Sequence, residues 1–155
     1  MKHTILLLIV LSVLSGCEVS PPQNLGVQNG QFSSCPDSPN CVCSQSEDEH
    51  KIQPLTYSGS TDFAKQDLLK LIEALPRTKV ITEKEHYIHA EFTIAVMGFI
   101  DDVEFYFDDA NKTIHVRSAA RVGYWDLGVN RRRVEKMRNL WQGKLTTDAR
   151  GTTSD

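Results

Sequence analysis

The chain has 155 residues, and its 20 acidic side chains outnumber its 17 basic ones, which gives a formal net charge of −3. This length fits one domain with a modest core. The acidic balance offers no general attraction to a polyanion, so we expect no nucleic-acid partner. The sequence contains no Walker A, G-x-S-x-G or H-E-x-x-H pattern, and we assign no catalytic residue, metal site or cofactor.

The first seventeen residues, MKHTILLLIVLSVLSGC, are typical of an export signal. Lys2 precedes an apolar run over residues 5–14, which is shorter than the roughly 20 residues that span a bilayer. The segment from Leu14 to Cys17 resembles the bacterial lipobox, in which the cysteine thiol receives a diacylglycerol. We therefore expect residues 1–16 to be a lipoprotein signal peptide and Cys17 to carry the lipid. The alternative is an ordinary secreted protein with an incidental cysteine, or an uncleaved anchor.

Lipidation would make the bilayer the first partner of the mature chain. Each buried CH₂ of an acyl chain such as palmitate contributes about 0.8 kcal/mol to the free energy of membrane binding, so several chains would anchor the protein stably. Glu18 stands where an aspartate would resemble an inner-membrane retention signal, which in a Gram-negative source favours the outer membrane, facing the periplasm. Residues 17–34 are polar and aperiodic, and we expect a flexible tether there. Residues 35–145 are expected to form a single domain, followed by a disordered tail over residues 146–155.

Hydrophobic periodicity predicts a strand and a helix in the first half of this domain. Residues 52–57 are typical of a short strand. Apolar residues then recur at helical spacing, and Ser60 or Thr61 can cap this helix. Pro76 ends the helical pattern.

Four strands and a last helix follow. The strands are expected over residues 78–85, 86–96, 101–108 and 113–120. Asn130 can cap the last helix. Its apolar stripe contains Val134, Met137, Leu140 and Trp141. The order β-α-β-β-β-β-α predicts an α+β fold, a two-layer sandwich in which two helices cover one face of an antiparallel sheet.

Alternation along these strands separates the two faces of the sheet. The positions expected to face the helices are Ile88, Ala90, Phe92, Ile94, Val96, Val103, Phe105, Phe107, Ile114 and Val116. The positions expected to face outward are Tyr87, His89, Glu91, Thr93, Asp102, Glu104, Tyr106, Thr113, His115 and Arg117. We favour a solvated outer face with cross-strand pairs such as Glu104 with Arg117, because antiparallel sheets commonly show water one polar face. A ligand platform is the alternative.

Three cysteines lie close together in CPDSPNCVCS, residues 35–44. Close thiols usually oxidise outside the cytoplasm. The prolines between Cys35 and Cys41 favour a turn, and a disulfide there would stabilise the fold by roughly 2 kcal/mol. A zinc site formed by these cysteines and His50 is the alternative, but the spacing lacks the usual C-x₂₋₄-C pair. We favour the disulfide, which leaves Cys43 as a spare thiol.

The most unusual stretch is RSAARVGYWDLGVNRRRVEKMR, residues 117–138. Three arginines follow the expected cap, where the helix dipole disfavours positive charge. Such a conflict suggests an anionic partner, which is either an internal carboxylate network or an external phosphate, carboxylate or lipid headgroup. We favour the internal network. The candidate ligand-binding residues are Arg117, Arg121, Tyr124, Asp126, Asn130, Arg131 and Arg133.

The three consecutive arginines are not expected to play the same part, because successive helical positions differ by about 100°. Arg133 lies nearest the apolar stripe and should meet a carboxylate or ligand near the sheet edge. Arg131 is a weaker candidate for the same role, and Arg132 should point into solvent.

The motifs CPDSPNCVCS and RSAARVGYWDLGVNRRRVE together resemble a bacterial and plastid family called domain of unknown function 1499. The family pattern is similar to CPxSPNCVSS followed by RSASRxGYxDxGxNRxRVE. The resemblance covers roughly residues 35–140 and includes the HAEF and DDVEF strands. The chain departs from the pattern at Cys43 and Ala120, where serine is usual. The resemblance implies no known activity, substrate or cofactor.

These observations favour a membrane-tethered cell-envelope protein with a non-catalytic binding or accessory domain. Its expected ligand is an anionic small molecule or lipid headgroup at the start of the last helix. One alternative is a hydrolase or transferase of an envelope substrate, which would use Asp126 or the face with His89, Glu91 and His115. The other alternative is a structural scaffold whose arginines only hold the loop.

Overall fold

The computed structural model describes residues 20–151, with side chains as far as residue 146. The expected signal peptide, the lipidation site Cys17 and the end of the expected tail lie outside these residues. The elements are β1 (Val27–Gln28), β2 (Gln31–Phe32), β3 (Cys41–Cys43), β4 (Leu55–Thr56), α2 (Thr61–Glu73), β5 (Thr78–Lys84), β6 (Tyr87–Thr93), β7 (Ile100–Asp108), β8 (Thr113–Ala120) and α3 (Val129–Gly151). Within residues 20–151, none of the helices is both long and apolar enough to cross a membrane.

One antiparallel sheet of six strands organises the fold. Its order is β3-β8-β7-β6-β5, and β4 pairs with β8 beside β3. Strands β5 to β8 follow one another as a meander, so each long strand pairs with its neighbour in sequence. The expected α+β class is confirmed. The short strand β3 and the separate β1–β2 hairpin were not expected from the sequence.

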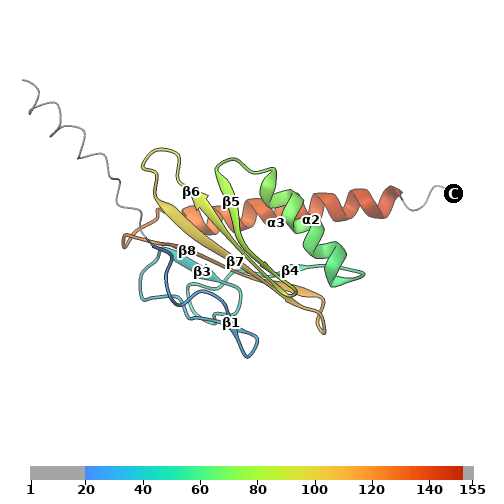
Figure 1. Cartoon of the computed structure of the whole chain (residues 1–155), viewed down its shortest axis with the longest axis horizontal. Helices are drawn as coiled ribbons and strands as arrows, with labels where there is room; N and C mark the ends of the chain where they lie inside the picture. The colour runs from blue at the N-terminus through green and yellow to red at the C-terminus, as the bar shows by residue number, and fades with distance from the viewer. Residues whose placement is uncertain (1–19, 152–155) are drawn as a thin grey trace, which may run out of the picture.

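The main core lies between one face of the sheet and the two helices, with α3 along the long axis of the molecule and α2 oblique to it (Figure 1). Eight of the ten positions expected to face the helices are buried in this core. Ile94 lies just beyond the end of β6 and is half-buried, and the prediction was wrong for Val96, which lies in the turn that follows. Val96 is 93% exposed.

The helices carry the apolar stripes that their sequences predict, with small differences. Ser60 caps α2 by accepting a hydrogen bond from the backbone N–H of Phe63 at 3.3 Å. α3 begins at Val129, one residue before the expected cap Asn130. Val134, Met137 and Trp141 are buried, but Leu140 is exposed and does not belong to the stripe.

Much of the polar face of the sheet is covered, which corrects the expectation of a solvated face. Residues 20–36, including the described part of the expected flexible tether, pack beneath the sheet, on the side away from the helices (Figure 1). Phe32 forms a second apolar cluster there with Tyr87 and Cys43. The backbone N–H of Gly26 donates to Glu104 Oε1 at 2.7 Å. His89, Asp102, Glu104 and Arg117 are therefore buried.

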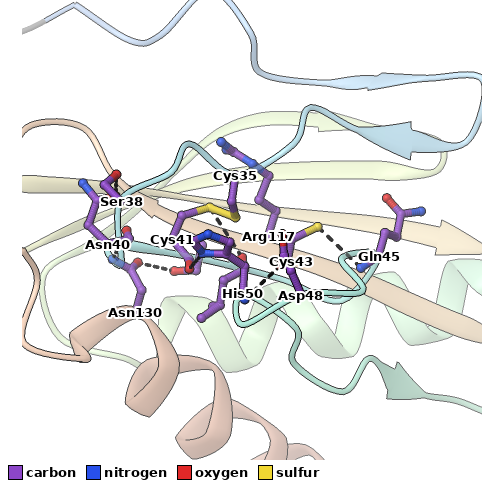
Figure 2. Close-up of a disulfide and its surroundings, with 12 residues drawn as sticks. Cys35, Ser38, Asn40, Cys41, Cys43, Gln45, Asp48, His50, Arg117 and Asn130 are labelled. Carbon is purple, nitrogen blue, oxygen red and sulfur yellow. Dashed lines mark hydrogen bonds between the residues drawn. A yellow bond between two sulfur atoms is a disulfide. The ribbon is translucent and has the colours of Figure 1, made fainter. Parts of the chain in front are cut away.

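The cysteine motif lies at the edge of the sheet, and Figure 2 shows its surroundings. Cys35 and Cys41 form a disulfide, which confirms the expected pairing and removes both sulfurs from any zinc site. Nδ1 of His50 donates to the carbonyl of Cys41 at 2.9 Å. Cys43 is a free, buried thiol, and burial raises its pKa. A thiol in this state is a poor nucleophile.

We predict that non-reducing peptide mapping finds Cys35 joined to Cys41. In the folded protein, Cys43 should resist alkylation by iodoacetamide, because its sulfur is buried and protonated. It should react at once in denaturant, which serves as the control. Stoichiometric zinc, a bridge that contains Cys43, or rapid labelling of the native protein would contradict this arrangement.

Candidate functional site

The cysteine motif and the arginine-rich motif contact each other through Asn40, which binds residues at and after the end of β8. Its side-chain Nδ2 donates to the carbonyl of Gly123 at 2.5 Å, and its Oδ1 accepts from Ser38 Oγ at 2.7 Å. Its own carbonyl accepts the backbone N–H of Ala120 at 2.9 Å and Nδ2 of Asn130 at 3.1 Å. Asn40 therefore positions both the loop after β8 and the first turn of α3.

Asp126 caps α3 in place of the expected Asn130. Its carboxylate accepts the backbone N–H groups of Gly128 and Asn130, both at 2.8 Å. These are donors that the first turn of a helix leaves without partners. A carboxylate at this position also offsets part of the positive charge that the arginines bring to the helix start.

Asn130 lies inside the first turn and is fully buried. Its Oδ1 accepts from Ser118 Oγ at 2.5 Å and from Arg133 Nη1 at 2.7 Å. Besides Asn40, its Nδ2 also donates to the Asp126 carboxylate at 2.9 Å. The side chain thus joins β8, the loop and the helix.

Arg133 meets a carboxylate, as expected from helical geometry, but this carboxylate lies at the start of the central strand β7 and not at the sheet edge. Its Nη2 donates to Asp101 Oδ2 at 2.5 Å, and its guanidinium lies over the ring of Phe92 at 5.0 Å. Burial raises the pKa of Asp101, although the guanidinium of Arg133 opposes this rise.

The other two arginines of the run bind backbone carbonyls. Arg131 donates to the carbonyls of Glu49 and Lys51, both at 2.8 Å. Arg132 is exposed, as expected, and donates to the carbonyl of Leu127 at 2.7 Å. The first contact fastens α3 to the loop after β3, and the second fastens the helix to the loop that precedes it.

Arg117 is paired beneath the sheet. Its Nη1 donates to Glu104 Oε2 at 3.0 Å, which confirms the expected cross-strand pair. Tyr87 donates to the other oxygen of Glu104 at 2.8 Å, and burial with this carboxylate beside it raises the pKa of Tyr87. Nε of Arg117 is the one buried side-chain nitrogen or oxygen of the described residues that has no hydrogen-bond partner.

Arg121 joins two carboxylates on the same face. It donates to both oxygens of Asp102, at 2.6 and 3.0 Å, and to Glu91 at 2.6 Å. His89 Nε2 lies 2.8 Å from Asp102 Oδ1. Burial alone would raise the pKa of Asp102, but the hydrogen bonds from His89 and Arg121 outweigh it, and the pKa is lowered.

The structure therefore separates the seven candidate residues into two groups and two single residues. Arg117 and Arg121 lie under the sheet, whereas Asp126, Asn130 and Arg133 form one cluster at the helix start. Arg131 faces the loop after β3, and Tyr124 is exposed. Sequence reasoning missed the role of Asn40, although its place in the first motif between Ser38 and the disulfide was a signal.

Two hollows border this network. We call the first the cationic hollow: it has a volume of about 330 Å³ and lies between the end of α2, the end of β6 and the start of α3. Its charged lining residues are Arg77, Arg132, Arg133 and Lys136, and its apolar ones include Leu75, Phe92, Ile94 and Met137. We call the second the N-terminal hollow, which has a volume of about 360 Å³. Its lining includes Arg117, Arg121, Asp102 and residues of the segment 20–36, which we call the covering segment.

The two hollows differ in charge. No carboxylate lines the cationic hollow, and neither Arg77 nor Lys136 forms an ion pair within residues 20–151. In the N-terminal hollow both arginines are bound to carboxylates. Of these two hollows, the cationic hollow is therefore the one that offers unneutralised positive charge to an anion.

We predict that Arg133→Ala lowers the free energy of unfolding by about 2–4 kcal/mol, because it leaves the Asp101 carboxylate buried and without its guanidinium. The loss should shrink at acid pH, where Asp101, with its raised pKa, takes up a proton. Arg132→Ala is the matched control and should change stability by no more than about 0.5 kcal/mol. Urea denaturation of both variants measures the difference, and equal small losses would show that Arg133 has no special partner.

Comparison with known proteins gives one match. The sequence model of a family described as "Protein of unknown function (DUF1499)" matches residues 31–140, which is more than half of the chain and includes both motifs. No curated protein and no solved structure matches. The chain therefore belongs to the domain of unknown function 1499 family.

Proposed function

We propose that this protein is a lipid-anchored cell-envelope protein whose domain binds an anionic ligand without catalysis. The observation that carries the binding role is the cationic hollow beside the first turn of α3. Two independent supports for the anchor come from the sequence: the apolar run over residues 5–14 and the lipobox-like segment that ends at Cys17.

The chemistry of the cationic hollow defines the ligand class. Arg77, Arg132 and Lys136 bring three positive charges that no carboxylate neutralises, and Arg133 lines the same space while it holds Asp101. Most of the other lining residues are apolar. A ligand with an anionic group and a short alkyl portion, such as an alkyl phosphate, a fatty acid or part of a lipid, matches both kinds of lining residue.

The buried arginines have a structural part in this proposal. Arg117, Arg121 and Arg133 are each bound to a buried or half-buried carboxylate, so their charges are already balanced. An external anion would have to compete with these carboxylates. The network supports a frame that shapes the loop and the helix start, while the outer cations receive the ligand.

A hydrolase or transferase finds less support than a binding domain. Asp126 uses both carboxylate oxygens to cap α3, so it is not free to act as a base. His89 is buried and lies against Asp102, and it does not line the N-terminal hollow. A general base must reach the proton that it removes from the substrate.

Lipidation is tested by mass spectrometry of the protein extracted from membranes. We expect a mature N-terminus at Cys17 that carries a diacylglyceryl group. Cys17→Ser is the control and should leave the signal uncleaved and the cysteine lipid absent. A mature N-terminus at another residue, or an intact signal in the native protein, would contradict the anchor.

Ligand binding is tested by calorimetric titration with inorganic phosphate and with hexyl phosphate at constant ionic strength. Hexyl phosphate should bind more tightly, because each CH₂ that leaves water contributes about 0.8 kcal/mol. Lys136→Gln should weaken binding, since it removes one unpaired cation from the lining. Lys79→Gln, an exposed site on β5, is the matched control and should have no effect. Absence of binding for both probes, or equal effects of both variants, would contradict the cationic hollow as a site.

A further inference from the structure

Exposed apolar side chains gather at one end of the molecule. Nine large apolar residues are exposed within the described chain, and six of them belong to two loops, residues 94–99 and 121–128. These six are Val96, Met97, Phe99, Tyr124, Trp125 and Leu127. Scattered exposed apolar residues need no explanation, but a cluster of this kind marks an interaction surface.

The sheet brings these two loops side by side. The register pairs Asp101, at the start of β7, with Ala120, at the end of β8, so the loop before β7 and the loop after β8 leave the same end. The backbone N–H of Arg121 donates to the carbonyl of Ile100 at 3.0 Å, which joins the two loops at their base. Figure 1 shows both loops at the left, at the end where the described chain begins. We call residues 94–99 and 121–128 the docking end.

The loop over residues 121–128 is held in place although three of its side chains are exposed. Asn40 binds the carbonyl of Gly123, Asp126 binds the N–H of Gly128, and Arg132 binds the carbonyl of Leu127. Leu127 has φ 53°, a left-handed conformation that costs free energy for a leucine, and its side chain is 83% exposed. The backbone is thus fixed in a shape that presents Trp125 and Leu127 outward.

The chain enters the domain beside this end. Pro22 lines the N-terminal hollow together with Ala120 and Arg121, so the covering segment begins next to the end of β8. Ser20 lies three positions after Cys17 in the sequence. Three extended residues span at most about 11 Å. An acyl group on Cys17 would therefore hold the docking end close to the bilayer.

The charges at this end fit a lipid surface as well. The cationic hollow opens beside residues 94 and 95 of the first loop, and Arg77, Arg132 and Lys136 line it. Positive side chains near a bilayer are attracted by anionic headgroups, and tryptophan and tyrosine are enriched at the membrane–water interface. Apolar tips and flanking cations together match a bilayer surface with anionic headgroups.

We propose that the docking end lies on the bilayer that holds the anchor, with Trp125 and its five apolar neighbours in the interfacial region. This proposal rests on the proposed lipid anchor. The domain would then have a fixed orientation on the membrane. The end of the sheet that carries both loops faces the lipid, and the opposite end, with the β7–β8 turn and the start of α2, faces away. The cationic hollow then opens at the lipid surface, where an anionic headgroup can reach it.

The two tryptophans provide a direct test. Trp125 is 72% exposed at the docking end, whereas Trp141 is 2% exposed in the core. The lipidated full-length chain is reconstituted into vesicles of phosphatidylethanolamine and phosphatidylglycerol, with or without brominated phospholipids, which quench tryptophans that reach the bilayer. We expect brominated lipid to quench the wild-type protein severalfold more than Trp125→Phe, which retains only Trp141.

A matched control places the reporter at the opposite end. Phe63, near the start of α2, is 78% exposed and lies on the side that should face away from the lipid. In the Trp125→Phe background, Phe63→Trp adds a reporter at a similarly exposed position. We expect aqueous acrylamide to quench this reporter and brominated lipid to leave it unchanged. The same quenching at both ends would overturn the orientation.

The outcomes separate this proposal from the anchor itself. Mass spectrometry of the reconstituted sample reports the lipid on Cys17. If the lipid is present and Trp125 remains open to acrylamide and insensitive to brominated lipid, the docking end is wrong and the anchor stands. If the lipid is absent, the proposed anchor is wrong. Flotation of the unlipidated chain with the same vesicles then tests the docking end by itself: flotation supports it, and failure to float overturns it. Burial of Trp125 without vesicles, in proportion to protein concentration, would assign the surface to a second copy of the chain and overturn the proposal.

Discussion

The buried amide of Asn130 is the constraint on which the end of the fold depends. A carboxamide has two donor hydrogens and two acceptor lone pairs, and this one uses all four. It donates to Asn40 and Asp126 and accepts from Ser118 and Arg133. Each partner comes from a different part of the chain. No other side chain of similar size offers two donors and two acceptors, so the helix start, the loop, β8 and the disulfide segment can meet only around an amide.

Charge burial under the sheet is the second constraint. An unpaired buried ion is costly, whereas a paired ion that is also hydrogen-bonded loses little. Glu104 shows the requirement clearly, because Arg117, Tyr87 and the backbone of Gly26 bind its two oxygens together. The covering segment therefore completes the hydrogen bonds of the sheet as well as excluding water. A tether without fixed structure could not supply the N–H of Gly26.

Sequence reasoning recovered what depends on local periodicity. Alternation identified the buried faces of β6 to β8, and the 100° step of a helix separated Arg133 from Arg132. It failed where a contact depends on chain segments far apart. Residues 20–34 carry no period, so nothing local indicated that they would cover the polar face. Val96 continued the alternation of β6, but the turn to β7 had already begun. The cationic hollow combines Arg77 with Lys136, and only the packing of α2 beside α3 brings them together.

The second motif contains two kinds of residue whose roles the structure distinguishes. One kind points inward and is bound to other polar groups. Arg117 and Arg121 are bound under the sheet, whereas Ser118, Asp126, Asn130 and Arg133 are bound at the helix start. Tyr124, Trp125 and Leu127 lie between them in sequence and are exposed. A loop that only joined β8 to α3 would need neither so many buried contacts nor three large apolar tips. Loops with few internal contacts move, and their ordering on a partner costs conformational entropy. A loop held by Asn40, Asp126 and Arg132 has already lost that freedom on folding. The polar network thus lowers the entropic cost of placing aromatic side chains on a surface, and this links the buried half of the motif to its exposed half.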